Sequence, residues 1–73
     1  QLDWVILRPG TLTNVAGRGT VRADFAIPYG PVPREDVAAT LVALVETPQI
    51  SRKIIELTEG DESISDAMFR LQR

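Results

Sequence analysis

The sequence predicts a small α/β domain, and three observations support this fold class. The chain has 73 residues, 44% hydrophobic and 25% charged, which fits one globular unit, because a domain typically takes roughly 100–200 residues. Segments with strand-like and helix-like patterns follow one another in the order strand, loop with a further strand candidate, helix, strand, helix. The first strand-like segment is continuously apolar, which is typical of a strand that helices cover on both faces.

The first predicted strand covers residues 2–7. Its apolar run, Trp4 to Leu7, is rich in β-branched and aromatic side chains, which favour extended structure. Pro9 has no backbone N–H, and Gly10 adopts unusual backbone angles at low cost. We therefore expect the chain to leave the sheet here, with a loop beginning at Arg8.

Residues 11–33 are predicted to form a long connection. They contain several glycines and prolines, and only the stretch 20–26 has a strand-like pattern. Connections of this length are often binding loops or lids, although a hairpin excursion is the simpler alternative. The segment Gly17-Arg18-Gly19 is only superficially like a phosphate loop, because no GxGxxG motif is completed and no long helix follows it. We interpret it as a flexible turn.

A helix is predicted to begin at Arg34. Pro33 suits a helix start, and the acidic residues Glu35 and Asp36 complement the positive end of the helix dipole. Neighbouring helical residues point about 100° apart, so these two carboxylates cannot flank one substrate bond as an acid–base pair. Their predicted role is structural, and an ion pair through Arg34 and Asp36 could tie the helix start to the loop at Arg8.

The middle of this helix is apolar on nearly every side. Between Val37 and Val45 only Thr40 is polar, so the segment has no single apolar stripe and needs cover from several directions. It is too short to span a bilayer, which takes about 20 apolar residues, and Pro48 ends it.

Two further elements complete the predicted chain. Residues 54–58 form a second β-branched strand, and Ser63 is predicted to cap a final helix over residues 64–72, with Asp66 as the acidic half of a capping-box-like pair. The buried stripe of that helix is predicted to consist of Ile64, Ala67, Met68 and Leu71.

Composition excludes several function classes. The net charge is −2, so neither nucleic acid nor a membrane surface is an expected partner. The chain has no cysteine and no histidine, which removes thiolate nucleophiles, disulfides and Cys/His zinc sites, and no metal ligand or catalytic residue is assigned. The lack of cysteine and of a secretory signal favours a cytoplasmic location. The start at Gln1 suggests a fragment or a processed product, and the acidic stretch 54–69 is either a docking patch or a solvated surface.

The tetrapeptide Arg8-Pro9-Gly10-Thr11 is the leading candidate for a binding site. It directly follows the apolar strand, and ligands of open α/β sheets bind outside the carboxyl ends of strands. Arg8 could hold a carboxylate or a phosphate, while a purely structural strand exit is the alternative. Tyr29 is the sole tyrosine, and position 33 is proline, so a Tyr/Lys proton-donor pair with four-residue spacing is not encoded.

Three segments together resemble a known family: residues 2–10, the run Pro33 to Ala38, and Ile54 to Leu57. In order and spacing they are similar to the C-terminal part of the atypical short-chain dehydrogenase/reductases. These are NAD(P)-binding, NmrA-like proteins, often described as NADH-flavin reductases or epimerase relatives. The resemblance implies the C-terminal portion of a Rossmann-like parallel sheet, with the first strand as a late strand of that sheet.

The resemblance also implies site residues. Arg8, Pro9, Gly10 and Thr11 would lie beside the nicotinamide end of NAD(P). Leu12, Thr13 and Tyr29 would belong to the loop that borders the substrate.

The family's glycine-rich βα turn, which holds the pyrophosphate, has no counterpart in these residues. The chain is therefore expected to be one unit over residues 1–73, a partial domain without its N-terminal half. Alone it should neither bind NAD(P) tightly nor turn over substrate. Its unpaired strand edge predicts a homodimer or a higher oligomer, or pairing with the missing half. Two alternatives stay open: a self-associating interaction module that uses the apolar helix, and part of a non-catalytic NAD(P) redox sensor.

Overall fold

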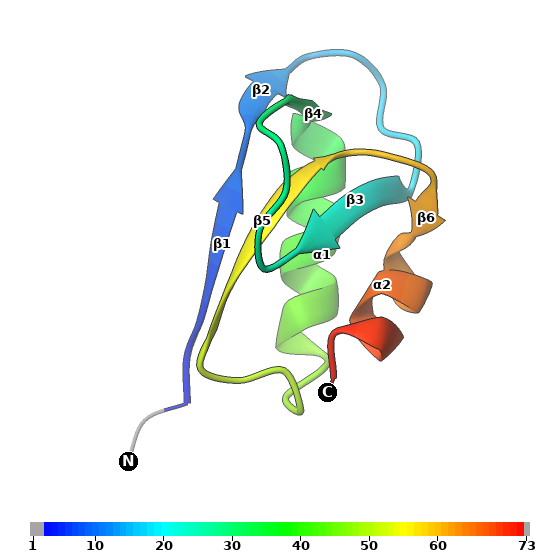
Figure 1. Cartoon of the computed structure of the whole chain (residues 1–73). Coiled ribbons are helices and arrows are strands. Elements are labelled where there is room, and N and C mark those ends of the chain that lie inside the picture. Colours follow the sequence, from blue (N-terminus) through cyan, green and yellow to red (C-terminus); the bar gives the residue numbers. More distant parts are fainter. Residues whose placement is uncertain (1–2, 73) are drawn as a thin grey trace.

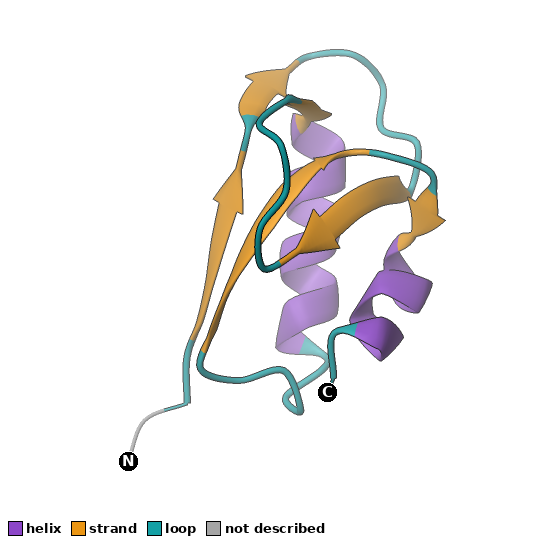
Figure 2. Ribbon diagram, in the orientation of Figure 1, coloured by secondary structure: helices purple, strands orange, loops and turns teal. Residues whose placement is uncertain are grey.

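The chain folds into a mixed sheet with two helices packed against it (Figure 1 and Figure 2). The structure is a computed structural model that describes residues 3–72. In chain order its elements are β1 (Val5–Pro9), β2 (Thr11–Thr13), β3 (Thr20–Asp24), β4 (Pro31–Pro33), α1 (Arg34–Val45), β5 (Lys53–Glu59), β6 (Glu62–Ser63) and α2 (Ile64–Arg70). This order of strands and helices confirms the predicted α/β class.

The main sheet has the strand order β1-β5-β3-β6. β1 runs parallel to β5, whereas β3 is antiparallel to both β5 and β6. A second, two-stranded sheet pairs β2 with β4 in parallel. The expected parallel arrangement therefore holds for β1 and β5, while the other half of the main sheet is antiparallel.

The first strand extends further than the sequence predicts. The register pairs Arg8 with Glu56 and Pro9 with Leu57, and the Gly10 N–H donates to the Leu57 carbonyl oxygen over 2.9 Å. The prediction of a loop beginning at Arg8 is therefore wrong. Among residues 3–72 β1 is at the edge of the sheet, so the missing N–H of Pro9 breaks no second ladder there.

The predicted long connection contains more regular structure than expected. The strand predicted over residues 20–26 is present as β3, but β2 and β4 also form, and they close the connection on itself through the parallel pairs Thr11 with Pro31 and Leu12 with Val32. The two-residue strand β6 was likewise not predicted. These elements are two or three residues long, too short for a periodic pattern to reveal them.

Both helices cover the same face of the main sheet within the described part of the chain. Along β5, Ile55 and Leu57 are buried in the core with α1 and α2, whereas Ile54 on the opposite face is exposed. In β1, Ile6 is 48% exposed. The expectation that helices cover both faces of the first strand is therefore wrong for residues 3–72, because both helices contribute to the same core.

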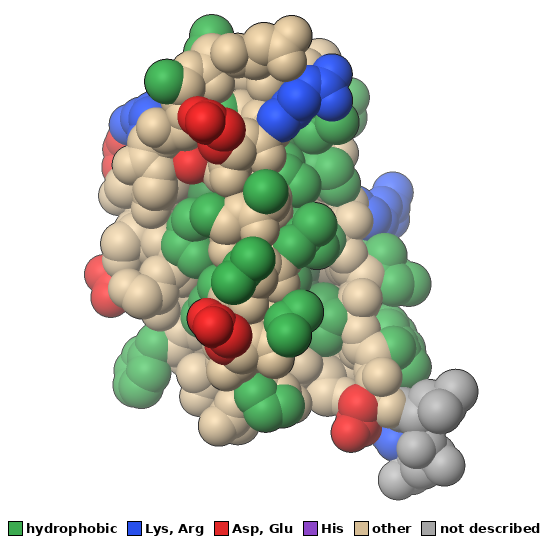
Figure 3. Space-filling view, turned by 180° about the vertical axis from the view of Figure 1, so that it is seen from behind, with side chains coloured by type: hydrophobic (Ala, Val, Ile, Leu, Met, Phe, Trp, Pro, Cys, Tyr) green, Lys and Arg blue, Asp and Glu red, His purple; other side chains and the backbone are tan. Residues whose placement is uncertain are grey.

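The first helix begins and ends where the sequence predicts, at Arg34 and Val45. Thr40 and Leu44 are buried, and the Thr40 hydroxyl donates to the Asp36 carbonyl oxygen over 2.7 Å. Hydrophobic side chains gather on the molecular face that α1 presents (Figure 3), and Leu41, Val42 and Val45 remain exposed there. No helix within residues 3–72 is long and apolar enough to cross a membrane.

The N-terminus of α1 holds the turn at Gly17-Arg18-Gly19. The buried Asp36 carboxylate accepts hydrogen bonds from the backbone N–H groups of Arg18 at 3.0 Å and Gly19 at 2.9 Å. The exposed Glu35 carboxylate accepts from the Gly17 N–H. Arg34 donates to the Asn14 side chain over 2.9 Å, so the predicted ion-pair tie from Arg34 and Asp36 to the Arg8 loop is wrong. The backbone N–H groups of the turn are instead bound by the side-chain carboxylates of Glu35 and Asp36, which differs from the predicted flexible turn.

The last helix confirms the predicted serine cap and stripe, although it ends at Arg70 and not at residue 72. The Ser63 hydroxyl accepts a hydrogen bond from the Asp66 N–H over 3.2 Å, as expected of an N-cap serine. Ala67, Met68 and Leu71 are buried, and Ile64 packs partly buried against the same core. Apolar spacing along one helical face was sufficient to predict this contact.

An arginine at the end of α2 fastens the helix to the sheet. Arg70 makes a two-bond contact with the Glu62 carboxylate, at 3.1 Å through Nε and 2.8 Å through Nη2. It also donates to Asp24 over 3.1 Å and to the Ala23 carbonyl oxygen over 2.6 Å. The hydrogen bonds from Arg70 lower the pKa of the Glu62 carboxyl below its usual value.

We expect Glu62→Gln to lower the free energy of unfolding by about 1 kcal/mol at neutral pH, because the partly exposed pair is screened by solvent. Glu62 has a lowered pKa in the folded state, so its contribution is fully present above the usual glutamate pKa and is lost as the pH falls through the folded value. The effect of the substitution should therefore shrink in acid. Urea unfolding at neutral and acidic pH measures both.

The neighbouring residue provides the control. Asp61 pairs with Arg18 at 3.0 Å, but its side chain is 95% exposed. Asp61→Asn should change the stability by less than about 0.5 kcal/mol at either pH. Equal losses in the two variants would contradict the role assigned to the Arg70 contact.

Candidate functional site

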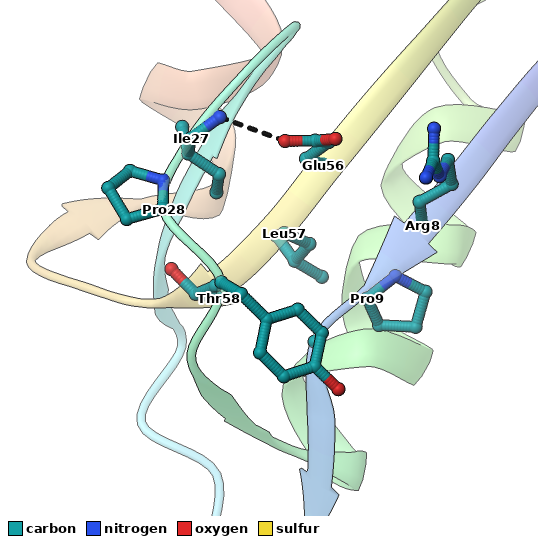
Figure 4. A pocket seen from close by; sticks show the side chains of 9 residues that line it. Arg8, Pro9, Ile27, Pro28, Glu56, Leu57 and Thr58 are labelled. Atoms are coloured by element: carbon teal, nitrogen blue, oxygen red, sulfur yellow. Dashed lines mark hydrogen bonds between the residues drawn. The ribbon is translucent and has the colours of Figure 1, made fainter.

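A pocket of about 140 Å³ lies where the parallel strands β1 and β5 end (Figure 4). Its walls come from three segments: the end of β1, the second half of β5, and the loop between β3 and β4. The lining residues are Arg8, Pro9, Gly10, Ile27, Pro28, Tyr29, Glu56, Leu57 and Thr58. The carboxyl ends of parallel strands are where ligands of α/β sheets bind, so this pocket is the candidate site.

The pocket brings together part of the set of site residues predicted from the sequence. Arg8, Pro9, Gly10 and Tyr29 all line it. Thr11 lies just outside, and its hydroxyl donates to the Tyr29 hydroxyl oxygen over 3.0 Å.

The other two predicted residues lie in β2. Leu12 and Thr13 pair with Val32 and Pro33 of β4, and neither lines the pocket. The predicted cofactor and substrate residues therefore divide into a group at the pocket and a pair beyond it.

Three pocket residues come from β5, which the sequence predicted as a strand without assigning it to a site. Glu56, Leu57 and Thr58 enter the pocket because β5 pairs in parallel with β1. The signal that could have revealed them is the parallel pairing itself, which places residue 56 beside residue 8. Nothing local in either segment specifies that pairing.

Gly10 allows the loop after β3 to close over the pocket. The Thr11 N–H donates to the Gly30 carbonyl oxygen over 3.0 Å. A Cβ atom on Gly10 would lie 1.8 Å from that same oxygen, so no larger residue fits without movement of the backbone. The close approach of the two backbones thus explains the glycine.

The charged residues of the pocket face each other without pairing. Arg8 and Glu56 are register partners on neighbouring strands and stand at the same pocket (Figure 4). One Glu56 carboxylate oxygen, Oε1, accepts from the Ile27 N–H over 2.9 Å, which fixes the loop at this side. The Arg8 guanidinium makes no hydrogen bond or ion pair with any other residue between positions 3 and 72.

The chemistry of the pocket is that of binding. Ile27 and Pro28 provide apolar wall, Arg8 provides a cation, and Glu56 provides a carboxylate. The Thr58 hydroxyl donates to the Glu59 carbonyl oxygen over 3.3 Å, so it is not paired with a base that could activate it. The arrangement suits a small planar or cyclic group with polar substituents.

Comparisons with known proteins show what this chain is similar to. The sequence model of a family described as NAD(P)H-binding matches residues 1–48. The chain is 39% identical over 70 residues to a protein of Bacillus subtilis (strain 168) named uncharacterized sugar epimerase YhfK, covering 96% of this chain and 33% of that protein.

Two solved structures have a similar fold. The oxidoreductase ylbE from Lactococcus lactis superposes with a TM-score of 0.89 at 30% identity, over 96% of this chain and 32% of that one. A protein from Bacillus halodurans, titled as a candidate NAD-dependent epimerase/dehydratase, superposes with a TM-score of 0.87 at 32% identity, over 96% of this chain and 34% of that one. The chain therefore spans about a third of the length of these relatives.

Proposed function

This chain belongs to the NAD(P)H-binding family, and from that membership we propose that it forms the nicotinamide-side and substrate-side wall of an NAD(P)-dependent oxidoreductase or epimerase. Within that family it is an NmrA-like, atypical short-chain dehydrogenase/reductase. The observation that carries the proposal is the pocket at the ends of β1 and β5, with Arg8 at its wall and unpaired among residues 3–72.

The pocket fits the ring end of the cofactor. Cavities of about 150 Å³ accept a benzene-sized ring, and this pocket measures about 140 Å³. Arg8 and the backbone of Pro9, Gly10 and Thr11 would hold the nicotinamide end, and Tyr29 would border the substrate. When bound, the nicotinamide ring supplies the hydride acceptor or donor.

These residues provide no comparable site for the diphosphate end of the cofactor. The 73 residues contain no GxGxxG motif, which is the sequence that lets a backbone approach a pyrophosphate. In this proposal the chain alone therefore does not bind NAD(P) tightly and does not turn over substrate. A longer polypeptide that also carries such a motif would do both, in the cytoplasm.

Calorimetric titration tests whether the 73-residue chain alone, or only a longer polypeptide, binds the dinucleotide tightly. NADH and NADPH are titrated into the 73-residue chain and into the product of the complete reading frame that encodes it. We expect tight binding of at least one dinucleotide by the longer product and none by the chain, because half of the dinucleotide would have no contact in the chain. Tight binding by the chain alone would contradict its proposed inactivity.

Arg8→Gln in the longer product should weaken dinucleotide binding about tenfold, as expected for the loss of one charge-assisted contact. Arg22→Gln is the matched control, since Arg22 is an exposed arginine of β3 that does not line the pocket. Equal affinities for the wild type and Arg8→Gln would exclude Arg8 from the cofactor site.

Self-association is a second candidate function, and a specific observation favours it. Within residues 3–72, β1 pairs on one side only, with β5, and Leu41, Val42 and Val45 are exposed on the nearby helix α1. Unpaired strand edges and exposed apolar side chains favour association with another chain. Static light scattering of the chain would measure it, and a monomer at all concentrations would exclude this function.

A redox sensor without catalysis would use the same cofactor pocket.

A further inference from the structure

We propose that Glu56 makes the pocket selective for neutral ligand groups that carry a hydrogen-bond donor beside an acceptor, and that it rejects anionic groups. This inference deepens the proposed function and rests on it, because it names the chemistry that the nicotinamide-side pocket accepts. Primary carboxamides and vicinal diols both have this donor–acceptor chemistry.

Arg8 and Glu56, the two charged residues of the pocket, lie on neighbouring strands at its wall. Parallel register places Arg8 and Glu56 next to each other on the same face of β1 and β5, and both line the pocket (Figure 4). Two opposite charges at this spacing would usually form an ion pair, but none joins them here, as far as residues 3–72 are concerned. The pocket therefore keeps one cation and one carboxylate available.

The loop backbone orients the Glu56 carboxylate at the pocket. The Ile27 N–H donates to Glu56 Oε1 over 2.9 Å, so the loop backbone holds the side chain at the pocket. No other described residue donates to Glu56, which leaves Oε2 as an acceptor for a ligand. Arg8 has five N–H donors and no acceptor. A ligand must therefore offer an acceptor to Arg8 and a donor to Glu56.

The charge of the ligand determines whether Glu56 favours or opposes its binding. A carboxamide presents its oxygen to Arg8 and its N–H to Glu56, and two adjacent hydroxyls can do the same. A carboxylate or a phosphate would satisfy Arg8 but would place a negative charge against Glu56, and such juxtaposition disfavours binding. A site built for anions would lack Glu56, so its presence in the pocket determines specificity.

A pair of ring compounds of nearly equal shape tests the proposal. Nicotinamide and nicotinate are titrated separately into the ¹⁵N-labelled chain, and the amide resonances of Ile27 and Leu57 are followed. We expect nicotinamide to shift both resonances and nicotinate to bind about tenfold more weakly. A neutral methyl glycoside and its uronate form a second pair, which distinguishes a diol source from a carboxamide source. If nicotinate binds as well as nicotinamide, and the uronate as well as the glycoside, the proposal is wrong.

Variants test whether Glu56 causes the preference for neutral over anionic ligands. Glu56→Gln should bind nicotinate about tenfold better than the wild type does, because it keeps an acceptor for Ile27 and loses the charge. Glu59→Gln, an exposed position on the same strand outside the pocket, should leave the preference unchanged. Arg8→Gln, which leaves the hydrogen bond between Ile27 and Glu56 intact, should weaken the binding of every probe.

Two further results would also overturn the proposal: unchanged selectivity in Glu56→Gln, or no shift with any neutral probe. The proposed function fails separately, because it depends on dinucleotide binding by the longer product and on its loss in Arg8→Gln. Dinucleotide binding that depends on Arg8, together with equal binding of both ring compounds, would retain the function and remove only the selectivity.

Discussion

Asp36→Ala is expected to lower the free energy of unfolding by about 3 kcal/mol, which is most of the stability of a chain this small. The Asp36 side chain is almost fully buried, at 2% exposed, and its carboxylate accepts from the N–H groups of Arg18 and Gly19. Each hydrogen bond to a charged group contributes about 1.5–3 kcal/mol. Alanine would leave both amides without their acceptor and would release the turn from the start of α1.

The adjacent carboxylate is the control. Glu35 is exposed and accepts one hydrogen bond, from the Gly17 N–H. Glu35→Ala should therefore cost less than about 1 kcal/mol. Asp36→Asn retains one side-chain oxygen and should recover part of the loss. Urea denaturation measures the stabilities, and hydrogen exchange at Arg18 and Gly19 reports on the turn. Equal losses in the two alanine variants would contradict the role assigned to Asp36.

Gly10→Ala is expected to destabilise the chain by about 2–4 kcal/mol and to disrupt the candidate pocket. A Cβ at this position would lie 1.8 Å from the Gly30 carbonyl oxygen, so the two backbones must separate. That separation breaks the hydrogen bond from the Thr11 N–H to Gly30, which is 3.0 Å long. Because Gly10 lines the pocket, the variant should also lose the nicotinamide-induced shift of the Ile27 resonance.

Gly30→Ala tests the same contact from its other side. A Cβ on Gly30 would meet only Thr58, at 3.6 Å, which is an ordinary van der Waals distance. This variant should remain within about 1 kcal/mol of the wild type, because replacing glycine with alanine at an unstrained position also restricts the unfolded chain. Thermal unfolding of both variants would separate them. A Gly10→Ala protein as stable as Gly30→Ala would show that the backbone contact is not required.

Local patterns in the sequence specify the elements that depend on neighbouring residues. Pro33 and the acids after it marked the start of α1, and Ser63 with Asp66 marked the start of α2. β5 was evident from its β-branched residues. These signals are local, because helix caps and side-chain periodicity involve residues within about four positions of each other. The family resemblance rested on the same segments and is confirmed by the NAD(P)H-binding match.

Contacts between residues that are far apart in the sequence depend on how the strands pair. Arg8 and Glu56 share a pocket because β1 pairs with β5 in one register, and a shift by one residue would turn Glu56 to the other face of the sheet. Asp36 holds the turn at Gly19 rather than the Arg8 loop, since the β2–β4 pairing determines where the connection runs. Strand pairing depends on partners far along the chain, so no local pattern encodes it.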